Sequence, residues 1–301
     1  MKYSLEQEQC LMKKNWKKLA VLTLLGAQVA TVSLTSYSVL AEESSSAQSV
    51  DLSAEIEAYK KFVSAEIDQL LKDTENFAKL IQEGKLDEAK KVYPLIRKAY
   101  ERSEPIAELF AESDVKIDYR LADYVEDNQT EEGWSGFHKI EQILWEEGKT
   151  EPAVSYAKQL VDDIKELKAK VATVEVTPEN MLTGAVDLLN EVATSKITGE
   201  EEIYSHTDLY DFEANIAGAE KIFSIFKDKI SAKDPELAKN LTEKFKAVND
   251  LLASHKVDAD HYKLYTDLSE KETKALAEAV TKLGEPLSQM AVILEADESG
   301  R

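Results

Sequence analysis

An all-α fold is the class that this sequence predicts, and three features indicate it. From about residue 53 onward, apolar residues recur at steps of three and four, which is the spacing of one helix face. Thr177-Pro178 and Asp234-Pro235 each place a capping residue before a proline, which is typical of a helix start. No stretch alternates apolar and polar residues as a half-buried strand would.

Two four-helix bundles are expected over residues 53–298, one in each half. In the first half, residues 53–175, the helices end or bend at glycine and proline. These residues are Gly84 after the first helix, Pro94 and Pro105 as kinks or breaks in the second (about 86–111), Gly148 after the third, and Pro152 in the first turn of the fourth. In the second half, residues 176–298, helices are expected at about 178–197, 208–230, 235–254 and 268–294.

The N-terminus has the pattern of a signal peptide over residues 1–41. A basic segment from Met12 to Lys18 precedes an apolar stretch, and "SVLA" ends at Ala41 with small residues where signal peptidase cleaves. Met12 is a candidate start of translation because it begins the basic segment. Residues 42–52 are polar and are expected to form a tether, and no transmembrane segment is expected in the cleaved chain.

The single cysteine, Cys10, lies upstream of the apolar stretch. A lipoprotein signal needs a cysteine directly after that stretch, and the sequence has none there. We therefore expect a secreted, cell-surface-associated protein with no lipobox cysteine and no disulfide. A monomer is the expected oligomeric state.

The chain is strongly acidic, with a formal net charge of −21. Residues 1–41 contain five lysines and two glutamates, which leaves −24 for the rest. Nucleic acids and anionic lipid surfaces both need a cationic patch, so both are disfavoured as partners. The charge favours cations, although acidity also serves simply to keep a helical protein in solution.

The run "GWSGFHKIEQILWEEG" contains the first candidate site. His138 and Glu141 are three residues apart, so on a helix they share one face and could converge on one ion. A hydrogen-bonded core histidine is the other interpretation, and for a lone histidine it is the more frequent one. Gln142 stands where the zinc-peptidase pattern His-x-x-Glu-His needs its last ligand, which disfavours a peptidase. His255 and His261 lie in a charged connection and are expected at the surface.

A second acidic pair could complete such a site. "YERSEPIAELF" places Glu101 and Glu104 three residues apart, and Pro105 adds a helix irregularity beside them. Asp118 follows in an expected turn or short helix. Chance is the competing explanation, because acids at this spacing are abundant in the chain. Four carboxylates and one imidazole would suit a hard cation such as iron, manganese or zinc.

These segments resemble the imelysin-like proteins, specifically the EfeO/EfeM group of bacterial iron-uptake proteins. The similar segments are "GWSGFHKIEQILW", "YERSEPIAELFAESDVKIDYR" and "YSHTDLYDFEANIAGAEKIF", within a similarity over roughly residues 55–295. The resemblance implies a two-bundle helical fold whose metal ligands are Glu101, Glu104, Asp118, His138 and Glu141. It also implies an iron permease and a haem peroxidase as partners. The chain matches the short form, which lacks the cupredoxin-like domain of some members.

The expected function is that of a non-enzymatic extracytoplasmic protein that captures iron and delivers it to the permease. A metal-dependent peptidase is one alternative, because the imelysin family was first described as peptidases. A binding module for an acidic polysaccharide or for haem is another, with His138 as the axial ligand of haem. In the third similar segment, His206 and Asp208 could form a second site. Ser205, Thr207 and Asp208 also look like helix-capping residues, and this structural role is favoured.

Overall fold

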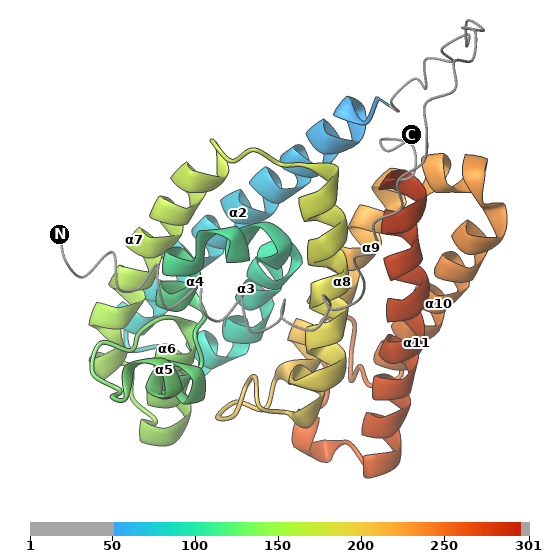
Figure 1. Ribbon diagram of the computed structural model, residues 1–301. Helices are drawn as coiled ribbons and strands as arrows, with labels where there is room; N and C mark the ends of the chain where they lie inside the picture. Colours follow the sequence, from blue (N-terminus) through green and yellow to red (C-terminus); the bar gives the residue numbers. More distant parts are fainter. Residues whose placement is uncertain (1–50, 296–301) are drawn as a thin grey trace, which may run out of the picture. The chain divides into compact units, whose positions relative to one another are not determined.

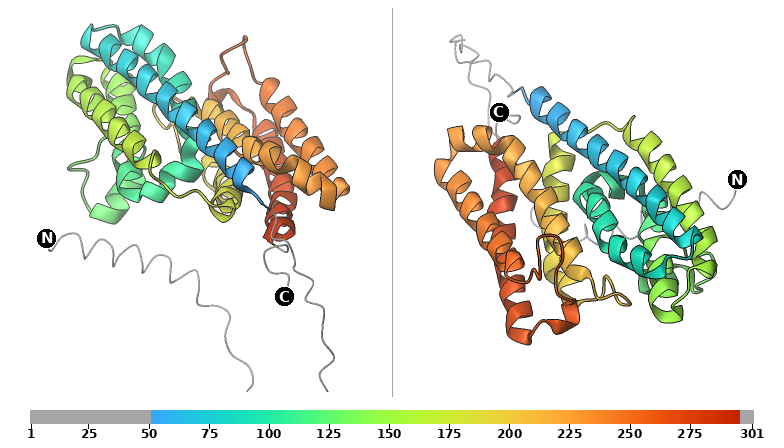
Figure 2. Two further views of the ribbon diagram at one scale, coloured as in Figure 1. Left: turned by 90° about the horizontal axis from the view of Figure 1, so that it is seen from above. Right: turned by 180° about the vertical axis from the view of Figure 1, so that it is seen from behind.

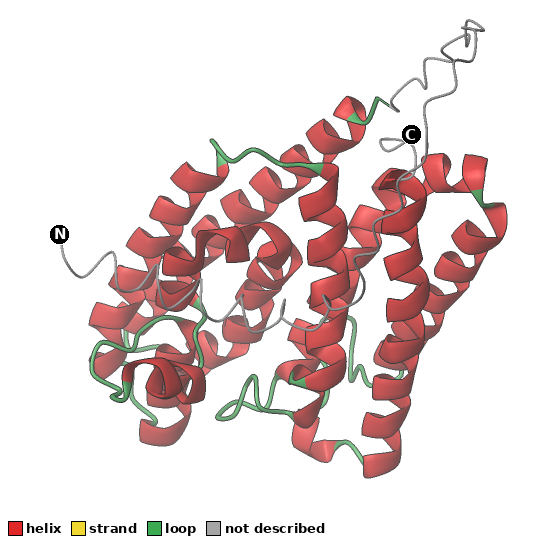
Figure 3. Ribbon diagram, in the orientation of Figure 1, coloured by secondary structure: helices red, strands yellow, loops and turns green. Residues whose placement is uncertain are grey.

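A computed structural model describes residues 51–295, and the regular structure in this range is helical (Figures 1 and 3). Strand-like pairing within it is limited to one isolated bridge, between Lys256 and Tyr262. The all-α prediction is confirmed. The expected signal peptide with Cys10, residues 42–50 of the expected tether and residues 296–298 of the expected domain lie outside the described residues.

Three long helices form the first group: α2 (Ser53–Gln82), α3 (Leu86–Ala107) and α7 (Val154–Val171). Helix α2 packs against both α3 and α7. Between α3 and α7 the chain forms only short elements. These are a 3-10 turn (Glu108–Phe110), α4 (Ala111–Ile117), α5 (Leu121–Asn128), α6 (Phe137–Gln142), a π-helical turn (Ile143–Glu147) and a second 3-10 turn (Glu151–Ala153).

The second group consists of α8 (Pro178–Thr194), α9 (Asp208–Lys233), α10 (Pro235–Ala253) and α11 (Glu270–Glu295), which lie side by side (Figures 1 and 2). The two predicted proline starts are confirmed. Thr177 accepts a hydrogen bond from the backbone of Asn180 at 3.1 Å, and Asp234 accepts one from Leu237 at 2.9 Å.

Helix α3 joins the two groups, because it packs against α2 on one side and against α8 and α9 on the other. Apolar side chains of both groups form one continuous buried cluster that extends from Leu52 to Leu294. The two groups of helices therefore share one core, and the division into two four-helix bundles near residue 175 stays a prediction.

Of the kink or break expected at Pro94, the break does not occur, because α3 continues through this residue. The helix lies between its neighbours, and their packing outweighs one missing backbone hydrogen bond. The helix ends at Ala107, two residues after Pro105, where the chain turns into α4. His255 is 5 % exposed, so the expectation that it lies at the surface is wrong.

Within residues 51–295, no helix is long and apolar enough to cross a membrane.

Candidate metal centre

A cluster of buried charged side chains lies where α3, the end of α4, the start of α6 and the α8–α9 connection meet. Eight carboxylates belong to it: Glu101, Glu104, Asp118, Glu141, Glu201, Glu202, Asp208 and Asp211. Seven of them are at most 5 % exposed, and the side chain of the eighth, Asp118, is 7 % exposed. The buried basic groups in contact with these acids are Arg97, Lys196 and His138, and the partly exposed Arg120 lies 3.6 Å from Glu201.

Gly136 brings α6 against the end of α4. Its φ is +89°, and a Cβ at this position would lie 2.4 Å from the carbonyl oxygen of Ile117, so only glycine fits here. Trp134 strengthens the same junction by donating its indole N–H to the carbonyl of Tyr119 at 2.6 Å. Asp118 caps the C-terminus of α4, and His138 is in the first turn of α6, so this junction places the two side chains together.

One nitrogen of the His138 ring, Nδ1, lies 3.2 Å from Oε2 of Glu141. The other oxygen of Glu141 accepts backbone N–H groups of Tyr204 at 3.0 Å and Ser205 at 2.7 Å. Burial alone would raise the pKa of Glu141, but the hydrogen bond and charge of His138 and the N–H of Ser205 lower it below its usual value. The ionised carboxylate only accepts, so Nδ1 is the nitrogen that donates to Glu141, and Nε2 is the nitrogen left to bind a ligand.

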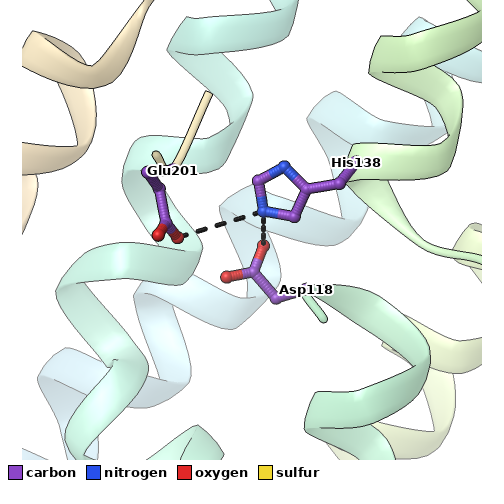
Figure 4. Close-up of side chains that lie close together, drawn as sticks. All are labelled: Asp118, His138 and Glu201. Carbon is purple, nitrogen blue, oxygen red and sulfur yellow. Dashed lines mark ion pairs between the residues drawn. The ribbon is translucent and has the colours of Figure 1, made fainter. Parts of the chain in front are cut away.

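The second nitrogen, Nε2, faces two carboxylates (Figure 4). It lies 3.8 Å from Oδ1 of Asp118 and 3.9 Å from Oε1 of Glu201. Both distances are too long for a hydrogen bond, and Nε2 itself is buried without a hydrogen-bond partner. Ligand atoms bound to one metal at about 2.1 Å lie roughly 3 to 4.2 Å apart, depending on the angle between them. The spacing of Asp118, His138 and Glu201 therefore fits a shared metal ion.

Arg97 neutralises part of the cluster from α3. Its fully buried guanidinium contacts Glu101 at 2.5 Å, Glu202 at 2.5 Å and Asp211 at 3.2 Å, and it also pairs with Asp118. Burial opposes ionisation of Glu101, but the charges of Lys196 and Arg97 together lower its pKa to about 2.

The cluster still contains more acids than bases. Burial raises the pKa of Glu104, Glu202 and Asp211 well above the usual range, and it raises that of Asp118 to about 7 and that of Asp208 to about 6. A buried carboxylate without a counter-charge is costly, so it takes up a proton or pairs with a cation. The chemistry of this cluster therefore favours uptake of a cation.

The structure distributes the five predicted ligands over two places. Asp118, His138 and Glu141 lie together, and His138 is shared by two groups of three side chains with metal-ligand spacing, completed by Glu201 in one case and by Glu141 and Glu202 in the other. Glu101 and Glu104 face Lys196 and Asn215. A third group with this spacing, near the surface, consists of Glu104, Glu108 and Glu191. The five-residue ligand set stays a prediction.

Comparison with known proteins identifies the family of this chain and several relatives. The profile of the imelysin family (Peptidase M75) matches residues 55–290. A protein of Staphylococcus aureus (strain MSSA476), named Efem/EfeO family lipoprotein, is 50 % identical over 246 residues, which cover 81 % of this chain and 86 % of the relative. A protein of the same name from Staphylococcus haemolyticus (strain JCSC1435) is 50 % identical over 238 residues, 79 % of this chain and 82 % of the relative.

The chain belongs to the imelysin family. The resemblance to the EfeO/EfeM group is thereby confirmed, together with the helical imelysin fold. The group name of the relatives describes no enzymatic activity, whereas the family name includes a peptidase.

The expected localisation of this imelysin-family protein is wrong. We expected a secreted protein without a lipobox cysteine, because Cys10 precedes the apolar stretch. The relatives are named lipoproteins, a class anchored at the cell surface through a lipid. The expectation relied only on where Cys10 stands relative to the apolar stretch. Anchoring depends on how the N-terminal segment is processed, and the helical domain does not encode this.

Several residues of the imelysin site were missed from sequence. Arg97 and Lys196 look like ordinary basic residues, and Glu201 and Glu202 belong to the acidic run "GEEEIYSHTD" directly before a recognised segment. Their closeness to that segment was the sequence signal that could have marked Glu201 and Glu202 as site residues. Asp208 accepts the backbone N–H of Glu202 at 3.2 Å and thus fixes the α8–α9 connection, whereas the expected cap residue Thr207 makes no capping hydrogen bond to α9.

Proposed function

We propose that this imelysin-family protein is an extracytoplasmic, non-enzymatic carrier that captures iron and delivers it to a membrane permease. One observation carries the proposal: His138 Nε2 is buried without a hydrogen-bond partner and faces Asp118 and Glu201 at 3.8 and 3.9 Å. Membership of the EfeO/EfeM group supports iron uptake as the process. A permease and a haem peroxidase are the partners that we propose.

In this proposal, Asp118, His138 and Glu201 are the primary ligands. Two carboxylates and an imidazole suit iron, and also manganese or zinc, better than a soft metal. Glu141 orients His138 through Nδ1, and it also lies close enough to join the ligand set if the ring rotates. Glu101 and Glu104 complete the acidic surroundings from α3 and are the remaining candidate ligands.

Carrying metal, rather than cleaving peptides, is favoured by the residue next to Glu141. Gln142 stands where the zinc-peptidase pattern needs its last histidine, and its side-chain oxygen accepts a hydrogen bond from Lys139 at 2.9 Å. Haem is disfavoured because His138 is 2 % exposed and its two ring nitrogens both face carboxylates, which leaves no apolar pocket around the ring.

Titration calorimetry of residues 51–295 with ferrous iron, manganese and zinc tests the proposal. We expect one ion to bind, and we expect His138→Ala to weaken binding on the order of 100-fold or more, because a ligand contributes more than the residues that orient it. His261→Ala is the matched control, since His261 is partly exposed and pairs only with Asp258. Binding that is equal in wild type and His138→Ala would refute the assigned site.

A further inference from the structure

Lys196 is a cation that the fold itself places inside the acidic cluster. Its side chain is 1 % exposed. Its ammonium nitrogen lies 2.9 Å from Glu101 and 3.2 Å from Glu104, and it lies 3.6 Å from Oε1 of Glu201. An ammonium donates three hydrogen bonds and is a compact charge, so it occupies this position much as a bound metal ion would.

One oxygen atom belongs to both cation positions. Oε1 of Glu201 is 3.6 Å from the Lys196 ammonium and 3.9 Å from His138 Nε2. A guanidinium nitrogen of Arg97 lies 3.5 Å from the same oxygen, and none of the three distances is a hydrogen bond, so no single partner holds the oxygen firmly. A metal bound at His138 would draw Glu201 toward itself and would repel the ammonium close by.

The position of Lys196 in the chain allows its side chain to move when a metal ion binds at His138. It opens a 3-10 turn, Lys196–Thr198, in the connection between α8 and α9. Glu201 and Glu202 belong to the same connection. Gly199, which lies between Lys196 and Glu201, has a φ of +77°. The competing cation and one of its acids are therefore on one short irregular segment rather than on separate rigid helices.

We propose that Lys196 is a built-in competitor of the captured metal. It neutralises Glu101, Glu104 and Glu201 in the metal-free protein, and it gives up Glu201 when the ion binds at His138. This inference rests on the proposed function. Its consequence is an affinity below what the surrounding acids would otherwise provide, which suits a protein that must release its ion.

Replacement of the ammonium by an uncharged chain of similar length tests this directly. We expect Lys196→Met to bind manganese more tightly than wild type, on the order of tenfold or more, because a unit positive charge this close to a divalent ion is strongly repulsive even in a partly screened interior. A second bound ion, held by the freed Glu101 and Glu104, would also support the proposal. A purely structural lysine predicts the opposite, since its loss would disorder the ligands and weaken binding.

Lys196→Arg keeps the positive charge, and we expect it to bind manganese within about threefold of wild type. Should Lys196→Met fail to fold, the same comparison is made between Glu104→Gln and the charge-balanced double variant Glu104→Gln/Lys196→Met. Tighter manganese binding by the double variant than by Glu104→Gln supports competition by Lys196. Unchanged or weaker manganese binding on loss of the lysine overturns the proposal. If wild type binds no manganese, iron or zinc, the proposed function fails instead.

Discussion

The two sides of the His138 ring differ in how completely their polar atoms are paired. On the Nδ1 side, Glu141 accepts bonds from His138 and from two backbone N–H groups, and the hydroxyl of Ser205 donates to Glu202 at 2.9 Å. On the Nε2 side, Asp118 and Glu201 stand beyond hydrogen-bond distance. One oxygen of Glu201 is, like Nε2, buried without a hydrogen-bond partner.

This difference separates the residues that hold the His138 ring in place from the residues that we propose bind the metal. Buried polar groups are normally paired, so a fully bonded side chain needs nothing further, whereas an unpaired one marks a place where a partner fits. Glu141 and Glu202 thus hold the ring and the α8–α9 connection in place. Asp118 and Glu201 face Nε2 without a hydrogen bond to it and have cations beside them: Asp118 pairs with Arg97, and Glu201 lies 3.5 to 3.6 Å from Arg97, Lys196 and Arg120.

The largest effect is expected on the Nε2 side. Glu201→Gln keeps the size of the side chain and removes its charge, so we expect the affinity for manganese to fall on the order of 100-fold or more. Glu202→Gln is the matched control on the other side. Glu202 contacts Arg97 and accepts the hydroxyl of Ser205, and it does not face Nε2, so the affinity should change little. Calorimetry on both variants measures the contrast, and equal losses would erase the distinction between the two sides.

A smaller effect is expected when the support is weakened. Glu141→Gln can still accept two backbone N–H groups but no longer fixes the proton on Nδ1, because an amide can also donate. Loss of such an orienting partner typically lowers metal affinity about 10- to 100-fold. The thermal midpoint of the metal-free variant should stay near that of wild type. If Glu141→Gln instead abolishes binding as fully as His138→Ala, then Glu141 is itself a ligand.

The long helices were predictable because their signals are local. Helix α8 was expected over 178–197 and is observed over Pro178–Thr194, and α10 was expected over 235–254 and is observed over Pro235–Ala253. Apolar periodicity and the proline starts suffice for these elements. The short helices and the π-helical turn between α3 and α7 were not predicted, because their ends depend on packing against other helices.

The site divides in the same way. His138 and Glu141 are one helical turn apart, so their contact is visible in sequence. Glu201 comes from a connection 63 residues later, and it has no periodic pattern that marks it. Nor does sequence show that Arg97 and Lys196 are buried, because a basic residue is most often at the surface.

The smallest effect in this series is expected from pH. In the metal-free protein, burial raises the pKa of Asp118 to about 7 and that of Asp208 to about 6. The folded state therefore holds protons between about pH 4 and pH 7 that the unfolded state has released, so the stability of the metal-free protein falls as the pH rises through this window. The pKa of Glu101 is lowered to about 2, so its contribution has the opposite sign and is lost as the pH falls from about 5 toward 2.

A metal ion bound at Nε2 takes the place of the proton on Asp118. The stabilisation by metal should therefore increase as the pH rises and Asp118 loses its proton. At one fixed manganese concentration, we expect the metal-induced rise in Tm to be several degrees larger at pH 7.5 than at pH 5, since 1 kcal/mol corresponds to about 2–4 °C for a chain of this size. Scanning calorimetry with and without manganese at both pH values measures it. The Glu201→Gln variant should show almost no metal-induced rise at either pH, and an equal rise at both pH values in wild type would mean that the metal does not bind at the carboxylates facing Nε2.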